Sequence, residues 1–207
     1  CTTFSTLHGI VDGTLAFVVS ELGEALGSWS SFLLYIFFTV SALFLAKPLL
    51  YTLGPKASIQ LGSRCLFCYV LSFFVALMCR NEPKLQWSVF LIGGCVGGIG
   101  AGVLWSGQGT YFTLNALRYA DLMGLDPSIV TAWFASIFAT MYLGMETIFK
   151  GMTSFVFFAS GWDEWLPLTF GVYIVVAVIA MEVFRVTGKD LKNADISRDE
   201  DKVGSAS

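Results

Sequence analysis

Long apolar runs separated by short polar linkers dominate the pattern along this chain. Five runs stand out, at about 32–53, 59–79, 87–107, 129–149 and 166–185. Each is close to the roughly 20 residues that an α-helix needs to cross about 30 Å of hydrocarbon. A weaker run at about 4–20 precedes them and contains His8 and Asp12, so it is interpreted as the later part of a span whose start is missing. The pattern therefore predicts six membrane helices.

The residues at the ends of these runs agree with helix boundaries. Asp126-Pro127 supplies an N-cap and a first-turn proline ahead of the fifth predicted span, and Gly54-Pro55 interrupts the chain between the second and the third. Residues 186–207 are polar and of mixed charge. We therefore expect a six-helix transmembrane bundle over 1–185, with its first helix truncated at the start. A polar tail or interdomain linker is expected over 186–207.

Composition excludes a soluble domain. Hydrophobic residues make up 56% of the 207 residues and charged residues only 13%, where soluble domains carry roughly 25%. Mean hydropathy is +0.72. The net charge of −3 is small and scattered, which argues against a nucleic-acid partner. The expected fold class is an all-α, multi-pass integral membrane protein whose partner is the lipid bilayer. The plasma membrane, an endomembrane and an organelle fit this composition alike.

The placement of Lys and Arg predicts the orientation. With six spans, one side of the membrane receives nine of the twelve basic residues and the other side three. The first group is Lys47, Lys56, Arg64, Arg118, Arg185, Lys189, Lys192, Arg198 and Lys202, and the second is Arg80, Lys84 and Lys150. Cytoplasmic loops carry the excess of positive charge. Both ends of the chain are therefore expected on the cytoplasmic side, or on the equivalent inner face of an organelle.

Glycines crowd the fourth predicted span. At 100° per residue they form two stripes, Gly93, Gly97 and Gly100 on one and Gly94, Gly98 and Gly102 on the other. Glycine lets helix backbones approach closely in a membrane, where lipid offers no hydrophobic drive to association. The order G-x-G-x-x-G of a nucleotide-binding loop is absent, and no strand precedes the segment. The stripes therefore predict a helix held between two neighbours.

The fifth predicted span carries a simpler small-residue face. Small residues recur there every four positions, at Ala132, Ser136, Thr140 and Gly144. Such a face is typical of helix packing in membranes and needs no chemistry.

The inner end of the fourth span is unusually polar for a membrane helix. It reads LWSGQGTY from Leu104 to Tyr111, followed by Thr113 and Asn115. One interpretation is an interfacial cap. The other is a gate or partner-binding site, with the candidate residues Trp105, Ser106, Gln108, Tyr111 and Asn115.

Ionisable residues inside membrane spans are costly and often mark function. Glu146 lies four residues before Lys150, and Glu182 lies three before Arg185, so local pairs account for them. Asp12 lies well inside the first span, with His8 one turn away on the same face. This pair is interpreted either as a proton relay or cation site, or as a hydrogen-bonded pair lining a wet cavity. If the protein moves a proton-coupled or cationic solute, Asp12 is expected to line a water-filled cavity facing the fourth span.

The residues contain no recognisable enzyme site. No serine or cysteine nucleophile has a base nearby in sequence, and His8 is the only histidine. Cys65 and Cys68 share a helical face, and two thiols without further ligands are interpreted as small apolar fillers. We therefore expect no catalytic activity, no bound metal and no cofactor.

The LWSGQGTY segment resembles the signature of the UNC93-like branch of the major facilitator superfamily. Leu22-Gly23, the LLY segment at 33–35 and LGPKASIQLG at 53–62 are similar to the second-span region of that family. The resemblance covers nearly the whole chain. It implies the N-terminal six-helix half of a twelve-helix protein, built as 3+3 inverted repeats. It also implies a partner, either another membrane protein or the missing C-terminal six-helix half.

One loop departs from the transporting members of that superfamily. They carry a G-x-L-A-D-R-x-G-R-K type loop between the second and third spans. Aligning its second glycine on Gly54 puts Lys47 at the first glycine, Tyr51 at the aspartate and Thr52 at the arginine, and only Lys56 keeps its charge. Without the acidic residue, the usual salt-bridged cytoplasmic lock cannot form in the same way.

Three functional classes remain. The degraded loop favours a non-transporting regulator or chaperone of a partner membrane protein, as the resemblance implies. The pair of Asp12 and His8 favours a secondary transporter of a small solute, with proton coupling as one form. The third class is an accessory subunit of a larger membrane complex. The regulator is the preferred prediction.

Overall fold

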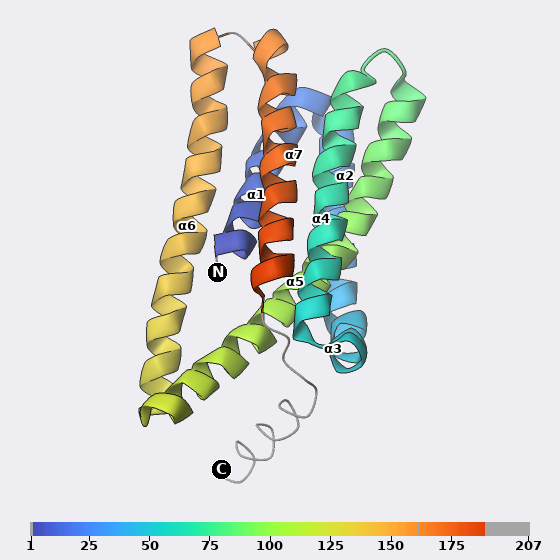
Figure 1. Cartoon of the computed structure of the whole chain (residues 1–207). Coiled ribbons are helices and arrows are strands. Elements are labelled where there is room, and N and C mark those ends of the chain that lie inside the picture. The colour runs from blue at the N-terminus through green and yellow to red at the C-terminus, as the bar shows by residue number, and fades with distance from the viewer. Residues whose placement is uncertain (1, 161, 189–207) are drawn as a thin grey trace.

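The structure is a computed structural model that describes residues 2–160 and 162–188, and all its regular elements over these residues are helical (Figure 1). The elements are α1 (Thr2–Leu22), α2 (Glu24–Val40), the π-helical turn η1 (Ser41–Leu45), α3 (Ala46–Leu53), α4 (Pro55–Met78), α5 (Pro83–Met123), α6 (Pro127–Ser160) and α7 (Trp162–Thr187). The all-helical prediction is confirmed for this part of the chain. Helix α7 runs two residues past the predicted boundary at 185, and positions 189–207 of the predicted tail lie outside the described residues.

Among the described residues, five helical stretches are long and apolar enough to cross a membrane. They are Glu24–Leu53, Pro55–Met78, Pro83–Met123, Pro127–Val156 and Trp165–Thr187. Helix α1, with 21 residues, is long enough but is not among them. Polar residues such as His8 and Asp12 lower its hydropathy. The chain is therefore a multi-pass membrane protein, while the sixth span and the 3+3 inverted repeats stay predictions.

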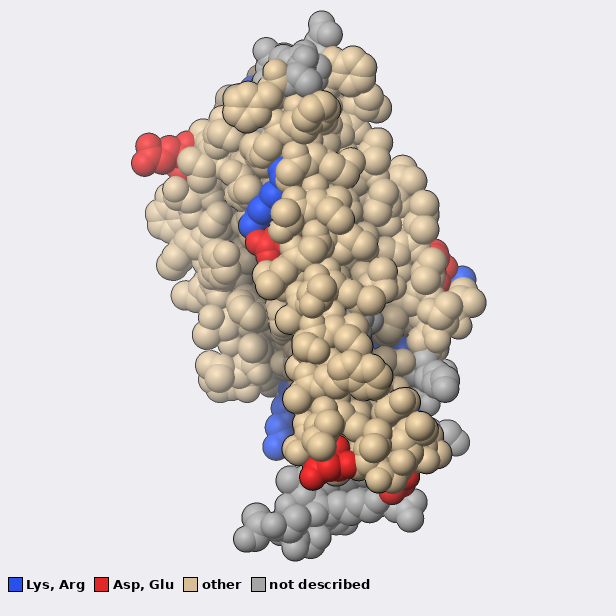
Figure 2. Space-filling model, turned by 90° about the vertical axis from the view of Figure 1, so that its left-hand side faces the viewer, with Lys and Arg blue, Asp and Glu red and all other residues tan. Residues whose placement is uncertain are grey.

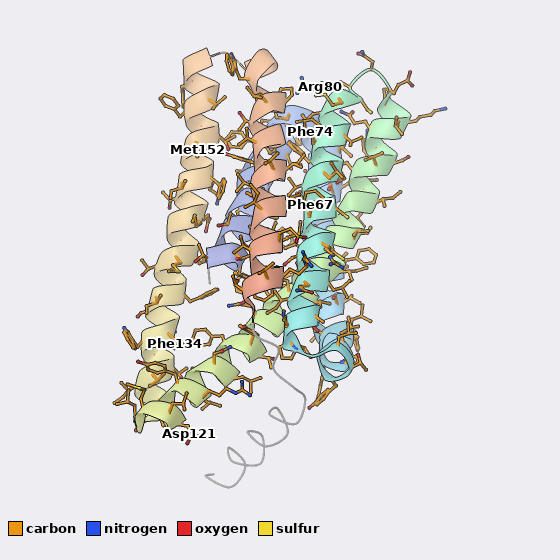
Figure 3. The ribbon with its side chains drawn as sticks, viewed as in Figure 1. Phe67, Phe74, Arg80, Asp121, Phe134 and Met152 are labelled. Atoms are coloured by element: carbon orange, nitrogen blue, oxygen red, sulfur yellow. The ribbon has the colours of Figure 1, made fainter. Side chains whose placement is uncertain are left out.

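The helices alternate in direction along the bundle (Figure 1). The connections α1–α2 and α4–α5, the end of α6 and the start of α7 lie at one end, and α3, the α5–α6 corner and the end of α7 lie at the other. Figure 3 places Arg80 at the first end and Asp121 at the second. Among the described basic residues, Arg80 lies at the first end and Lys47 of α3 at the second, as predicted, whereas Lys189, Lys192, Arg198 and Lys202 lie outside the described residues.

Cysteine labelling should test the orientation. In a background without the native cysteines, an impermeant thiol reagent added from outside should modify cysteines introduced at Glu24 and Glu82. These residues lie at the end with few basic residues. The same reagent should miss a cysteine at Lys56. Modification of the Lys56 site in intact cells would contradict the predicted topology.

The second membrane segment is bent by a π turn that the sequence did not predict. In η1 the N–H of Ala46 donates to the carbonyl of Ser41, five residues back. Pro48 lies just beyond this turn, and a proline can neither donate to the residue four positions earlier nor fit against its carbonyl. A wider turn ahead of Pro48 relieves that conflict. The hydroxyl of Ser41 also donates to the carbonyl of Ile99 on α5 at 2.8 Å.

Helix α5 is much longer than the predicted span of 87–107. It has 41 residues, and its last part leaves the bundle and runs below α6 (Figure 1). A second small core fills this corner, built from Ala116, Ala120 and Val130. Gly124 ends the helix with a left-handed φ of 63°, which glycine adopts at little cost.

Helix α6 begins at the predicted site. A carboxylate oxygen of Asp126 accepts hydrogen bonds from the backbone N–H of Ser128 at 2.8 Å and from its hydroxyl at 2.6 Å. Asp126 is thus the N-cap and Pro127 the first residue of the helix. The two hydrogen bonds from Ser128 lower the pKa of the Asp126 carboxyl, because they stabilise its charged form.

The main core lies where α4, α5 and α7 meet. Five aromatic side chains are fully buried there: Tyr69 and Phe73 from α4, Phe90 from α5, and Phe170 and Tyr173 from α7. The ring centroids of Phe73 and Phe170 are 4.7 Å apart in an edge-to-face arrangement, which aromatic quadrupoles prefer. This core fixes α7 against the helices that carry the candidate sites.

Candidate functional site

The first glycine stripe of α5 lies against α4. A methyl group built at Gly97 would lie 2.7 Å from Cβ of Tyr69, and methyl groups at Gly93 and Gly100 would overlap Ser72 and Cys65. These distances leave no space for any side chain at the three glycines.

The second stripe lies against α2 and η1. A methyl group at Gly94 would lie 2.9 Å from the carbonyl oxygen of Ser30, and one at Gly102 would lie 2.6 Å from the backbone nitrogen of Ala42. At Gly98 it would meet the α2 backbone near Phe38 at 3.0 Å. Helix α5 is therefore held between two helices, with one stripe facing each.

The small-residue face of α6 does not pack within the described chain. Ala132, Ser136, Thr140 and Gly144 are all exposed, and a methyl group built at Gly144 would meet nothing within 4 Å. Helix α6 lies at one edge of the bundle, where no described helix covers this side of it. A seam formed by these four residues with another helix of residues 2–160 and 162–188 is thus excluded, and the face stays a predicted contact for something else.

Figure 2 looks onto the side of the molecule that α6 forms. Down its middle this surface is mostly uncharged, with one adjacent pair of blue and red side chains, and further charged side chains show at its edges and toward its lower end. Helix α6 carries one ion pair there, between Lys150 and Glu146, as the four-residue spacing predicted. An uncharged face of this kind can lie against lipid or against another membrane helix.

His8 lies inside an aromatic cluster formed by α1, α5 and α6. Its ring centroid is 5.3 Å from that of Phe4, 5.0 Å from Trp105 and 5.4 Å from Tyr142. Only 8% of the residue is exposed, and its Nδ1 atom has no hydrogen-bond partner among the described residues. Trp105, from the LWSGQGTY segment, thus packs inside this cluster.

Asp12 lies one turn further along α1 and contacts α6. The hydroxyl of Tyr142 donates to its carboxylate at 3.2 Å, and the pair formed by Glu146 and Lys150 begins one turn beyond Tyr142. The partner that the structure gives to this carboxylate is thus on α6, and a cavity between Asp12 and the fourth span stays a prediction.

The remaining residues of the polar segment point to different neighbours. Gln108 is buried, and the ring of Tyr111 packs edge-to-face on Phe184 of α7 at 5.9 Å. The amide of Asn115 donates to the carbonyl of Tyr111 at 2.6 Å within the same helix. By helical spacing Gln108, Tyr111 and Asn115 share one face of α5, whereas Ser106 lies on the opposite side of the helix.

Ser106 instead lines a cavity of about 290 Å³ between α5 and the bent second segment. The whole lining is Ala42, Ala46, Lys47, Leu50 and Tyr51 from η1 and α3, with Ser106 and Thr110 from α5. The ammonium of Lys47 lies over the ring of Tyr51, 5.8 Å from its centroid. Sequence comparison drew attention to Lys47 and Tyr51 only as departures from a loop motif. The four-residue spacing of Lys47 with Tyr51, and of Ser106 with Thr110, is the signal that each pair shares a helical face.

Within the described residues, no group of three or more His, Cys, Asp or Glu side chains is placed to hold a metal ion. Cys65 packs toward Gly100, and its neighbour Cys68 is exposed. The arrangement offers a tightly packed helical frame, a buried aromatic cluster around one histidine and a small cationic cavity.

A bundle of long apolar helices with a glycine-packed centre defines a multi-pass integral membrane protein. The model of the family described as "Ion channel regulatory protein UNC-93" matches residues 21–197 of this chain. The chain therefore belongs to the UNC-93 family, as the LWSGQGTY segment and its flanking motifs predicted. No curated protein and no solved structure matches it.

Proposed function

We propose that this protein regulates or escorts a partner membrane protein by lateral helix contact, without transporting a solute itself. The observation that carries this proposal is the family match over residues 21–197, because the family is described by ion channel regulation. That the chain is a multi-pass membrane protein of this family does not depend on the proposal.

The exposed face of α6 supports contact with a partner. Small residues at Ala132, Ser136, Thr140 and Gly144 let a second helix approach closely, and serine and threonine hydroxyls can hydrogen-bond across such a contact. A lipid-facing helix gains nothing from four small residues in register. We infer that the partner's helix lies along this face.

The environment of Asp12 favours regulation over transport. Its carboxylate already accepts a hydrogen bond from Tyr142, and the neighbouring His8 is enclosed by aromatic rings. A site that couples solute transport must be reachable by the solute or by a proton. The surrounding aromatic rings reduce the access to His8. Buried ionisable groups in membrane helices nonetheless often mark transport paths, so a proton-coupled transporter is the second candidate.

A photo-crosslinking experiment tests the proposal. A photoreactive amino acid at Ser136, in the full-length protein in its native membrane, should give one discrete adduct with a membrane protein. The same residue at the exposed Val175 of α7 should not. Gly144→Leu should abolish the adduct and change the abundance or conductance of that partner. It should leave folding intact, because nothing lies within 4 Å of that position.

Two outcomes would oppose the proposal. An adduct between Ser136 and a further part of the same polypeptide would assign the face to a second half of the protein. Solute uptake into proteoliposomes that Asp12→Asn abolishes would establish the transporter, because this change removes the charge and keeps the shape of the side chain. A regulator should keep the Ser136 adduct when Asp12 is replaced.

A further inference from the structure

The cavity between η1, α3 and α5 lies at the end of the bundle that is predicted to collect most of the basic residues. Figure 1 shows α3 at the same end as the α5–α6 corner and the end of α7. In the predicted orientation this is the cytoplasmic side, whose leaflet carries anionic lipids and a negative surface potential.

Charge and hydrogen-bond donors meet across the cavity. Lys47 supplies an exposed ammonium on one side, and no ion pair between described residues involves it. Ser106 supplies a hydroxyl from α5 on the other side, while the hydroxyl of Thr110 already donates to the carbonyl of Ser106 at 3.1 Å. Ammonium and hydroxyl groups on opposite walls are suited to an anion with several acceptor oxygens, such as a phosphate.

The remaining surroundings are apolar. Ala42, Ala46 and Leu50 complete the lining, and the next residues of the π turn, Leu43 and Phe44, are 68% and 69% exposed. A volume of about 290 Å³ is near the lower end of the roughly 300–1,000 Å³ of ligand pockets, which suits a headgroup and not a whole lipid. The exposed apolar side chains beside it offer a surface for acyl chains.

We propose that this cavity binds the phosphate headgroup of an anionic phospholipid from the leaflet on the basic side. Lys47 pairs with the phosphate, the ring of Tyr51 holds the ammonium in place by a cation–π contact, and Ser106 donates a hydrogen bond. The acyl chains lie along Leu43 and Phe44. The site rests on the predicted orientation and is independent of whether the protein regulates or transports.

Native mass spectrometry of the full chain in detergent, titrated with phosphatidylglycerol or phosphatidylcholine, tests the site. The unmodified protein should bind one phosphatidylglycerol about five-fold more tightly than phosphatidylcholine, and Lys47→Gln should remove this preference, since one lysine near an anionic surface contributes ~1 kcal/mol. Ser106→Ala should weaken phosphatidylglycerol binding by about two- to five-fold through the lost hydrogen bond. The matched control Lys84→Gln, at the opposite end of the bundle, should leave the preference unchanged.

Each contrary result is decisive. A preference that survives Lys47→Gln, or one that the unmodified protein lacks, would overturn the proposal. Inorganic phosphate is the third arm of the titration. If it displaces phosphatidylglycerol at equal concentration, the acyl chains contribute nothing, and the assignment to a lipid would be wrong.

Discussion

Gly98→Leu is expected to abolish folding of the protein in detergent. A methyl group at this position already meets the carbonyl of Leu34 and comes within 2.8 Å of Cβ of Phe37. An added side chain that meets other side chains typically lowers the free energy of unfolding by roughly 1–3 kcal/mol, because those side chains can rotate away. The backbone atoms of α2 cannot rotate away, so the whole helix must move. We therefore expect a larger loss of stability. Gel filtration should show an aggregate in place of the single peak of the parent.

The same helix supplies a matched control. Gly109→Leu places the same side chain on α5 where nothing lies within 4 Å, and this variant should purify and melt as the parent does. Gly98→Ala should fall between the two. A Gly98→Leu protein with the melting temperature of the parent would show that α2 and α5 do not pack at glycine-limited distance.

Trp105→Ala is expected to lower stability strongly through the loss of the aromatic cluster. The indole packs edge-to-face on Phe4 and His8 at 5.0 Å and on Tyr142 at 5.8 Å, so it joins α1, α5 and α6. Removing a tryptophan from a soluble core costs roughly 3–5 kcal/mol. Part of that cost is the transfer of the side chain from water into the protein, and this part is smaller here because lipid is as apolar as the protein interior. We therefore expect the free energy of unfolding to fall by an amount at or below the lower end of that range.

Thermal unfolding in detergent measures this effect against an exposed tryptophan. Trp29 is 55% exposed, and its edge-to-face contact is with Phe32 on its own helix. Trp29→Ala should therefore shift the melting temperature little. Equal shifts for the two variants would mean that the cluster does not hold α1 in place.

The sequence by itself determined the class of protein and several of its boundaries. Apolar runs near the length of a bilayer require membrane helices whatever their neighbours, because backbone groups in lipid must be satisfied within the segment. Gly54-Pro55 and Asp126-Pro127 mark helix ends through local backbone chemistry, and the helices begin at Pro55 and Pro127. The two glycine stripes of α5 also follow from periodicity alone.

Only the tertiary structure decided which partner each face receives. The stripes of α5 looked alike in sequence, yet one faces α4 and the other faces α2. The small-residue face of α6 has the same pattern and faces no described helix. The contact of Asp12 with Tyr142 of α6, 130 residues further along the chain, was likewise not predictable from sequence.

The cavity at Lys47 depends on the same distinction. Its lining comes from η1 and α3 on one side and from Ser106 and Thr110 of α5, about 60 residues further along the chain, on the other. Helical periodicity fixes the direction of a side chain relative to its own axis. The helix that the side chain contacts depends on packing between segments distant in sequence. No local sequence pattern encodes this packing.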